Sequence, residues 1–392
     1  MSQALLQEAK ALSPWLNEVF FRIHRNPELG KEEYKTQALI LEELKKMGIE
    51  GKPIADTGVV ATIYGGKPGK TVAFRADMDA LPLQEMTDLP YKSEVPNVMH
   101  ACGHDTHVTM LLGAAKLFMQ HKDELEGNIK LFFQPNEEGD GGAVRMIEAG
   151  CMENPHVDAV FYGHCTPGLP IGSVTVRSGS VNAASNSFTL TFHGKGAHGA
   201  SPHLGTDVIV AACQTVTALQ TICSRRTRPT DAIVVTVGAF HAGKAGNVLP
   251  EVATLDGMIR TIDPETRKRA KEDFRQIVGN IASAMDVDVD IDLRDGYAAT
   301  INDEEMTQLM RASAAKLMGE ENVHTSKYPG LGTEDFGYFS QVAPGCYYSI
   351  GISNPESTDN APLHNPRFTA DPNGFPYGAA LYFQIAQDFL SK

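Results

Sequence analysis

The sequence predicts an α/β protein in which a mostly parallel sheet is interrupted by a smaller inserted module. Short apolar runs typical of strands alternate with helical patterns between residues 59 and 162. Such alternation favours a parallel sheet with helices on both faces. Near residue 185 the order becomes strand, helix, two strands, helix and strand, which is that of a ferredoxin-like β-α-β-β-α-β module. The 392 residues suffice for two or three domains.

The predicted elements begin with helical patterns at the N-terminus. Apolar residues recur at helical spacing over residues 5–23 and 31–47, and Asn26-Pro27 and Gly48 end the two runs. The α/β region then contains predicted strands at residues 59–64, 71–75, 129–133 and 159–162 and helices at 106–119 and 143–149. The inserted module contains predicted strands at residues 187–192, 232–240, 253–262 and 287–293 and helices at 206–222 and 264–284. A last helix follows Pro372.

These patterns divide the chain into two domains. We expect residues 1–184 and 296–392 to form one discontinuous domain, and residues 185–295 to form a ferredoxin-like domain inserted into it. The inserted segment is long enough to be a domain of its own. Folding of that segment in isolation would support the division.

Composition and charge restrict the partners and the location that we expect. The chain carries 34 basic against 48 acidic residues, a formal charge of −14, without a conspicuous basic run. This balance argues against nucleic acid and anionic membranes as partners. The six cysteines contain no C-x-x-C pair, the N-terminus lacks the features of a signal peptide, and no apolar stretch is long enough to span a membrane. We therefore expect a cytoplasmic protein.

Two loop segments carry residue types that suit metal binding. In H-A-C-G-H-D-T-H (residues 100–107), Cys102 and His104 lie two residues apart and are good ligands for zinc-like ions. The alternative is a buried cysteine beside solvated histidines. Glu137 and Glu138 follow an apolar strand, and adjacent like charges there are unfavourable unless a cation neutralises them or one is protonated. One carboxylate can then bind metal while its neighbour faces a water.

Three further segments contain single histidines that are weak signals alone. His164 follows an apolar strand, and strand ends in open α/β sheets are where ligands bind. His364 lies between prolines in P-L-H-N-P, and His198 lies in G-K-G-A-H-G within the inserted module. Each of them is as readily a structural residue.

Taken in order, these segments resemble the metal-dependent amidohydrolases that include hippurate hydrolases, bacterial N-acyl-amino-acid amidohydrolases and plant auxin-conjugate hydrolases. The resemblance extends from F-R-I-H-R-N-P-E-L (residues 21–29) through R-A-D-M-D-A-L-P (residues 75–82) to the C-terminus. One departure is Asn136, where the family often has alanine, which leaves the local shape of the pocket open.

The resemblance implies two divalent ions per subunit. The positions that match the family's ligands are Cys102, His104, Glu138, His164 and His364. The cysteine would bridge the ions, and zinc is the favoured ion for thiolate, imidazole and carboxylate ligands, with manganese, cobalt and nickel as alternatives. Glu137 corresponds to the general base. It would take a proton from a water and later return it to the leaving amine.

The resemblance also implies a role for the inserted domain as a lid that pairs subunits, so we expect a homodimer or a higher homo-oligomer. His198 would hold the carbonyl oxygen or the substrate carboxylate, either in its own subunit or in the partner's site. Asn247 and Arg260 match the residues that bind the substrate carboxylate.

The function implied is cleavage of the amide bond of N-acyl-L-amino acids, with a small-molecule substrate. Metallo-dipeptidase or carboxypeptidase activity on the same scaffold is the alternative. A different class of enzyme would use Cys102 as a nucleophile with His104 or His107 as base, but it leaves the glutamate pair and His364 without a role. A non-catalytic metal-binding protein is the third reading. Undecided roles are those of Asp79, Asp105, His107 and His203.

Overall fold

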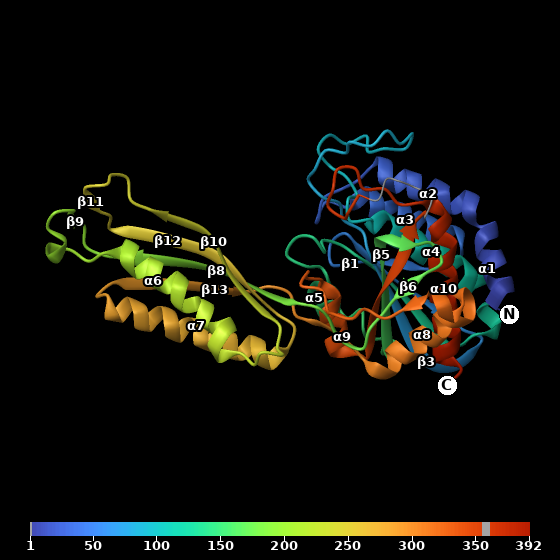
Figure 1. Cartoon of the computed structure of the whole chain (residues 1–392). Helices are drawn as coiled ribbons and strands as arrows, with labels where there is room; N and C mark the ends of the chain where they lie inside the picture. The colour runs from blue at the N-terminus through green and yellow to red at the C-terminus, as the bar shows by residue number, and fades with distance from the viewer. Residues whose placement is uncertain (1, 355–360) are drawn as a thin grey trace. The chain divides into compact units, whose positions relative to one another are not determined.

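The computed structural model describes residues 2–354 and 361–392, which form two compact units (Figure 1). The first unit comprises Met1–Gly179, Ile301–Tyr328 and Asp335–Lys392, and the second comprises Ser180–Thr300 and Pro329–Glu334. Whether residues 185–295 fold as a separate domain stays a prediction.

An eight-stranded sheet forms the centre of the first unit, with the order β1-β2-β4-β3-β5-β16-β6-β15. The neighbours β4, β3, β5 and β16 pair in parallel, whereas β1 pairs with β2, and β2 with β4, in antiparallel fashion. The strands of this sheet are β1 (Gly51–Ile54), β2 (Gly58–Tyr64), β3 (Lys67–Asp77), β4 (Glu126–Gln134), β5 (Ala159–Pro170), β6 (Val174–Thr175), β15 (Val323–His324) and β16 (Gly345–Ser353). The prediction of a mixed α/β fold with a large, mostly parallel sheet is confirmed.

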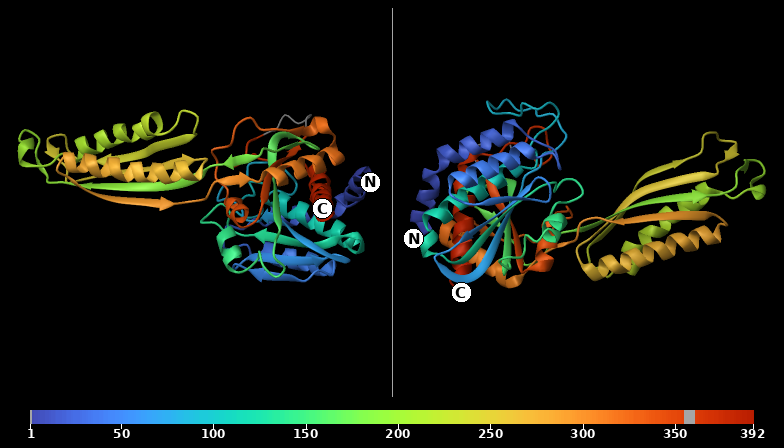
Figure 2. Two further views of the ribbon diagram at one scale, coloured as in Figure 1. Left: turned by 90° about the horizontal axis from the view of Figure 1, so that it is seen from below. Right: turned by 180° about the vertical axis from the view of Figure 1, so that it is seen from behind.

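Helices cover both faces of this sheet (Figure 2). Because successive side chains of a strand point to opposite faces, Leu131 and Phe133 of β4 pack in the larger core while Phe132 packs in the smaller one. The helices that contribute to the larger core are α1 (Ser2–Ala11), α2 (Ser13–Arg25), α3 (Tyr34–Lys46), α4 (His104–Gln120), α8 (Glu304–Met318) and α10 (Phe375–Leu390). Those on the other face are α5 (Ala143–Glu148) and α9 (Phe339–Val342).

The second unit contains an antiparallel sheet with the order β10-β12-β8-β13. Its elements follow the chain as β8 (Ala184–His193), α6 (Val208–Thr221), β10 (Ile233–Ala242), β12 (Val252–Thr261), α7 (Pro264–Ala284) and β13 (Asp288–Asp295). Both helices pack on one face, where Phe188, Leu190 and Phe192 of β8 are buried. The short strands β9 (Ala197–His198) and β11 (Val248–Leu249) pair with each other, as do β7 (Gly179–Asn182) and β14 (Thr300–Asn302).

The structure differs from the predicted elements in two respects. The apolar pattern over residues 5–23 forms two helices, because Pro14 at the start of α2 lacks the amide proton that one continuous helix needs. Strand β5 also extends to Pro170, well beyond the predicted end at residue 162, and so contains His164. Among the residues described, no helix is long and apolar enough to cross a membrane.

Candidate metal centre

All five predicted ligands lie in the first unit, at the end of the sheet where its parallel strands finish. His364 Nε2 is 3.3 Å from Cys102 Sγ, and His164 Nε2 is 3.7 Å from the same sulfur. His364 Nε2 is also 3.0 Å from Glu138 Oε1, which lies 4.0 Å from His104 Nε2. Ligands of a tetrahedral zinc ion are roughly 3.3–3.8 Å apart, given bonds of about 2.0–2.3 Å. The atoms therefore stand at separations close to those of ligands around shared ions.

The five side chains form two groups that have one residue in common. Cys102, His104 and His164 make the first group, and Cys102, Glu138 and His364 make the second, with the ligand atoms in each group within 4.8 Å of one another. A residue shared by two adjacent groups of ligands is in the position that a bridging ligand needs. This arrangement favours Cys102 as the bridge.

The local backbone places these residues by means of two left-handed conformations. Gly103 has φ 77°, and a Cβ there would lie 2.4 Å from Cys165 Sγ, so only glycine fits between Cys102 and His104. His364 has φ 61°, and its amide donates to the carbonyl of Ala101 at 2.8 Å. This hydrogen bond joins the C-terminal loop to the loop that contains Cys102.

The ring of His104 is oriented by a carboxylate. Its Nδ1 donates to Asp79 Oδ1 at 3.1 Å, so the neutral ring carries its lone pair on Nε2. That Nε2 is buried and has no hydrogen-bond partner among the residues described. Asp79, whose role the sequence left undecided, also accepts the amide of Glu138 at 2.9 Å through its second oxygen. A carboxylate behind a histidine in this way is typical of metal ligands.

His164 is also prepared as a neutral ligand. Its Nδ1 donates to the carbonyl of Cys165 at 2.7 Å, which leaves the lone pair of Nε2 facing Cys102. Burial and the nearby His107 lower the pKa of His164 to about 3. The ring therefore stays unprotonated at neutral pH, as metal binding requires.

Several acidic side chains surround these ligand atoms, and this concentration of negative charge favours the binding of cations. Burial, together with Glu138 and Glu137, raises the pKa of the Cys102 thiol well above its usual value. Burial by itself lowers the pKa of His104, but Asp77, Asp79 and Glu138 raise it to about 10. Bound divalent ions would neutralise this excess of carboxylates. Thiolate, imidazole and carboxylate are also the ligand types that zinc prefers, so the residues present fit a pair of such ions.

Both ring nitrogens of His107 lie within hydrogen-bonding distance of other protein groups. Its Nε2 accepts the amide of Cys165 at 2.9 Å, and its Nδ1 is 2.5 Å from Asp77 Oδ1, so neither nitrogen is available to a metal or a substrate. Asp105 likewise faces His24 Nδ1 at 2.6 Å and accepts the amide of Thr106. The reading of Cys102 as a nucleophile thereby loses His107 as its base. The raised pKa of that thiol is also the opposite of what a nucleophilic cysteine needs.

A buried ionic network that the sequence analysis did not predict lies beneath the ligands. The guanidinium of Arg75 donates to Asp77 Oδ2 and Asp335 Oδ1, both at 2.8 Å, and all three side chains are fully buried. Asp335 also accepts the amides of Gly142 and Ala143 at 2.9 and 3.0 Å. The available signal was chemical, since an arginine within an otherwise apolar strand must have buried acidic partners.

The predicted residues of the inserted module lie in two separate places of the second unit. His198 on β9 pairs with Val248 on β11, and the amide of Gly199 donates to the carbonyl of Asn247 at 2.8 Å. Figure 1 shows β9 and β11 together at one end of this unit. Nδ1 of His198 accepts the amide of Ala200 at 3.1 Å, so the neutral ring carries its proton on Nε2. His203 lies nearby in the short turn Pro202–Leu204 and is exposed.

Arg260 lies at the opposite end of the second unit, on β12 of the four-stranded sheet. It pairs with Ser185 near the last residue of β12, whereas Val252 at the start of β12 pairs with His193. Eight residues at about 3.3 Å each separate Val252 from Arg260, a distance of about 26 Å. Nη1 of Arg260 is buried without a hydrogen-bond partner among the residues described, and burial lowers the pKa of this guanidinium. The unit therefore does not bring Arg260 together with His198 and Asn247.

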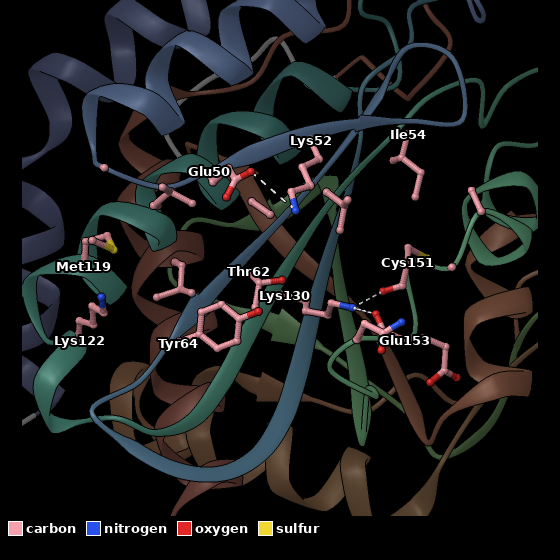
Figure 3. Close-up of a pocket in the computed structure, with 18 residues that line it drawn as sticks. Glu50, Lys52, Ile54, Thr62, Tyr64, Met119, Lys122, Lys130, Cys151 and Glu153 are labelled. Carbon is pink, nitrogen blue, oxygen red and sulfur yellow. Dashed lines mark hydrogen bonds and ion pairs between the residues drawn. The ribbon is translucent and has the colours of Figure 1, made fainter.

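A separate pocket of about 360 Å³ lies on the first unit (Figure 3). It is lined by residues of β1 and β2 and by the loop that contains Cys151 and Glu153, and none of the predicted site residues is among them. Lys130 extends into this region, where its Nζ donates to the carbonyls of Cys151 and Glu153 at 2.7 and 2.6 Å. Backbone oxygens therefore accept the hydrogen bonds of this ammonium group.

Comparison with known proteins agrees with this geometry. The model of peptidase family M20/M25/M40 matches residues 73–388. The chain is 39% identical to thermostable carboxypeptidase 2 of Saccharolobus solfataricus, covering 100% of this chain and 99% of the relative. It is 38% identical to hippurate hydrolase of Campylobacter jejuni, covering 98% and 99%.

The solved structure of a Bacillus subtilis protein, described as a dinuclear metal binding peptidase of the M20 family, is also similar. It shares 31% identity and has a TM-score of 0.84, with 97% of this chain and 99% of that chain covered. The family match, the full-length relatives and the cluster of ligands all lead to one conclusion. The chain belongs to peptidase family M20/M25/M40 and is a metal-dependent amidohydrolase.

Proposed function

We propose that the protein uses two divalent ions to hydrolyse the amide bond of N-acyl-L-amino acids, releasing a carboxylic acid and a free amino acid. The observation that carries this proposal is the pair of ligand groups sharing Cys102, with Glu137 next to them and in neither group. Hippurate hydrolase among the relatives supports an N-acyl substrate by its name. Zinc is the ion that we favour, and manganese, cobalt and nickel are alternatives.

Glu137 is the residue that we assign to proton transfer. Its carboxylate lies within 4.8 Å of ligand atoms of His104 and Glu138 but belongs to neither of the two groups that share Cys102. The bound ions would supply Lewis acidity and a lowered pKa for water. Glu137 takes the proton of the attacking water and later delivers it to the leaving nitrogen, so that one carboxylate serves first as base and then as acid.

Residues of the inserted module would recognise the substrate, and their separation supports a dimer. An N-acyl-amino acid is far shorter than the roughly 26 Å between the two ends of β12, so one copy of the module cannot apply Arg260 and His198 to the same molecule. We propose that Arg260 binds the α-carboxylate in one subunit, and that His198 and Asn247 come from the partner subunit. The proton on Nε2 of His198 is available for donation to the carbonyl oxygen.

The edges of the module's sheet favour the same dimer. The edge strand β13 carries exposed Asp288, Asp290 and Asp292, which oppose pairing with another strand. The other edge strand, β10, has the sequence IVVTVGAFHA with no Asp, Glu, Lys, Arg or Pro. An edge without such residues is suited to pairing with a second copy of itself. The module would thereby act as a dimerisation domain. We also propose that it acts as a lid, and that the enzyme is cytoplasmic.

The test is a panel of N-acetyl, N-benzoyl and longer N-acyl amino acids alongside dipeptides, assayed with each metal added to metal-free protein. Faster turnover of N-acyl amino acids supports the proposal. The name of the Saccharolobus relative favours carboxypeptidase activity as the alternative, and preferential cleavage of peptides would establish it. Mixing a His198→Ala variant with a Glu137→Gln variant tests the shared site, because only a mixed dimer with His198 acting in the partner's site restores activity.

A further inference from the structure

The N-terminal segment from His24 to Glu33 contacts three of the segments around the metal centre, although it lies outside the residues that match the family model. Its sequence is H-R-N-P-E-L-G-K-E-E, and the proposed reaction gives these residues no role. Three of its contacts reach these segments: Glu28 O accepts the amide of Ala80 at 2.8 Å, His24 Nδ1 is 2.6 Å from Asp105 Oδ2, and Glu33 Oε1 accepts the amide of Asn136 at 2.8 Å.

Within this segment, Glu33 is the residue whose side chain binds the backbone next to Glu137, the proposed general base. Its side chain is completely buried, and its second oxygen accepts the hydroxyl of Thr57 at 2.5 Å. No ion pair of Glu33 occurs within the described part of the chain. Burying a carboxylate without a cation opposes folding. The stability of the folded protein alone therefore does not explain a glutamate at position 33.

The backbone that Glu33 holds is unusual. Asn136 has φ 57°, a left-handed conformation that asparagine tolerates better than alanine. A Cβ on Gly30 would lie 2.0 Å from Asn136 Oδ1, which shows how closely the N-terminal segment packs on this turn. The structure thus gives a reason for Asn136, the one departure from the family pattern. It also shows that this turn depends on contacts from outside itself.

The backbone amides of both residues next to Glu137 in the chain are bound by buried acidic side chains. The amide of Asn136 donates to Glu33, and the amide of Glu138 donates to Asp79. Asp79 simultaneously orients His104, so it belongs to the metal centre, whereas the side chain of Glu33 binds Asn136 in the turn and Thr57 but none of the five candidate ligands. We propose that Glu33 is a positioning residue that fixes the turn before Glu137 and so aims the carboxylate of this general base. The proposal rests on the role proposed above for Glu137.

Glu28 offers a matched control within the same segment. Its carboxylate also accepts backbone amides, those of Lys35 and Thr36 at 3.0 and 2.9 Å, but these belong to the start of α3 and not to a loop of the metal centre. Both glutamates thus bind backbone amides with their side chains. Of these two glutamates, only Glu33 binds the amide of a residue next to Glu137.

The experiment compares Glu33→Ala, Glu33→Gln and Glu28→Ala in the full-length, metal-loaded protein. For each variant, kcat, KM, bound metal and Tm are measured. We expect Glu33→Ala to lower kcat about 100-fold while KM and metal content change by less than about twofold, because a small displacement of a catalytic group is enough for such a loss. Glu33→Gln should restore most of kcat, since its amide oxygen accepts from Asn136 and its NH₂ group donates to Thr57. Glu28→Ala should lower Tm and leave kcat within about threefold of the wild type.

Wild-type kcat in Glu33→Ala, or an equal loss of kcat in Glu28→Ala, would overturn the proposal. If Glu33→Ala does not fold, Glu33→Asp replaces it. This variant keeps the charge but shortens the side chain by one methylene, and a kcat equal to that of Glu33→Gln would then overturn the proposal. Glu137→Gln separates the two hypotheses: if it retains turnover, the role of Glu137 itself is wrong. If it is inactive while Glu33→Ala is fully active, only the positioning role fails.

Discussion

Replacement of Asp79 by asparagine is a sharp test of the metal centre, because its two contacts cannot both survive the change. Asp79 accepts one hydrogen bond from His104 Nδ1 at 3.1 Å and another from the amide of Glu138 at 2.9 Å. Asparagine has one acceptor oxygen and one NH₂ group in their place. The amide of Glu138 can only donate, so the oxygen of asparagine must face Glu138 and its NH₂ must face His104.

The substitution would weaken metal binding because it changes which ring nitrogen of His104 carries the proton. With a donor opposite Nδ1, the ring must carry its lone pair on Nδ1 and its proton on Nε2, the atom that the ion requires unprotonated. Loss of such a supporting carboxylate typically weakens metal affinity or activity by about 10- to 100-fold. We therefore expect Asp79→Asn to lose 10- to 100-fold in affinity for the ion that His104 would hold, which corresponds to about 1.4–2.8 kcal/mol.

The assay is competition for the metal between the metal-loaded protein and a chelator of known affinity, with kcat measured at saturating metal. Asp140→Asn is the control, because Asp140 lies in the same loop as Glu138 but forms an exposed pair with Lys31 at 2.7 Å. Its metal affinity should match that of the wild type. If Asp79→Asn binds both ions as tightly as the wild type does, the assignment of His104 Nε2 as a ligand is wrong.

Three other predictions concern the reaction and stability. Glu137→Gln should keep both ions by elemental analysis but lower kcat by about 10²–10⁴-fold, the usual contribution of a general base; metal-loaded protein with substantial turnover would contradict this. Arg260→Ala should raise KM for N-acyl-amino acids about tenfold or more and leave ester substrates without a carboxylate nearly unaffected, because a charge-assisted pair is lost; an unchanged substrate preference would remove Arg260 from the site. Burial by itself lowers the pKa of His24, but Asp105 and Glu85 raise it from 6.5 to about 9. The stabilisation from this proton is therefore full below about pH 6.5, falls as the pH rises to about 9, and amounts to about 3 kcal/mol. Denaturant unfolding between pH 6 and 9 should show this decrease in the wild type and a smaller one in His24→Gln, and equal slopes would contradict it.

Apolar periodicity predicted most elements of the fold well because it reflects burial directly. Helix α7 begins and ends at the predicted residues, Pro264 and Ala284, since a long amphipathic pattern lies between an N-cap aspartate and a following strand. The pattern was less informative at β5, because beyond Tyr162 its residues, G-H-C-T-P-G-L-P, contain only one large apolar side chain. There the strand is maintained by parallel pairing with β16, which no local pattern reveals.

The amino-acid sequence alone specifies the chemistry available to this protein: the residue types of the five candidate ligands, the adjacent pair Glu137 and Glu138, and the strand that precedes this pair. The tertiary structure decided which atoms meet. It showed that Cys102 is common to two groups of ligands, that Asp79 orients His104, that Glu33 reaches the turn before Glu137, and that Arg260 lies far from His198 within the second unit. The physical reason is that residue type and periodicity are local properties, whereas a hydrogen bond or a shared ion depends on distances between segments that lie far apart in the chain.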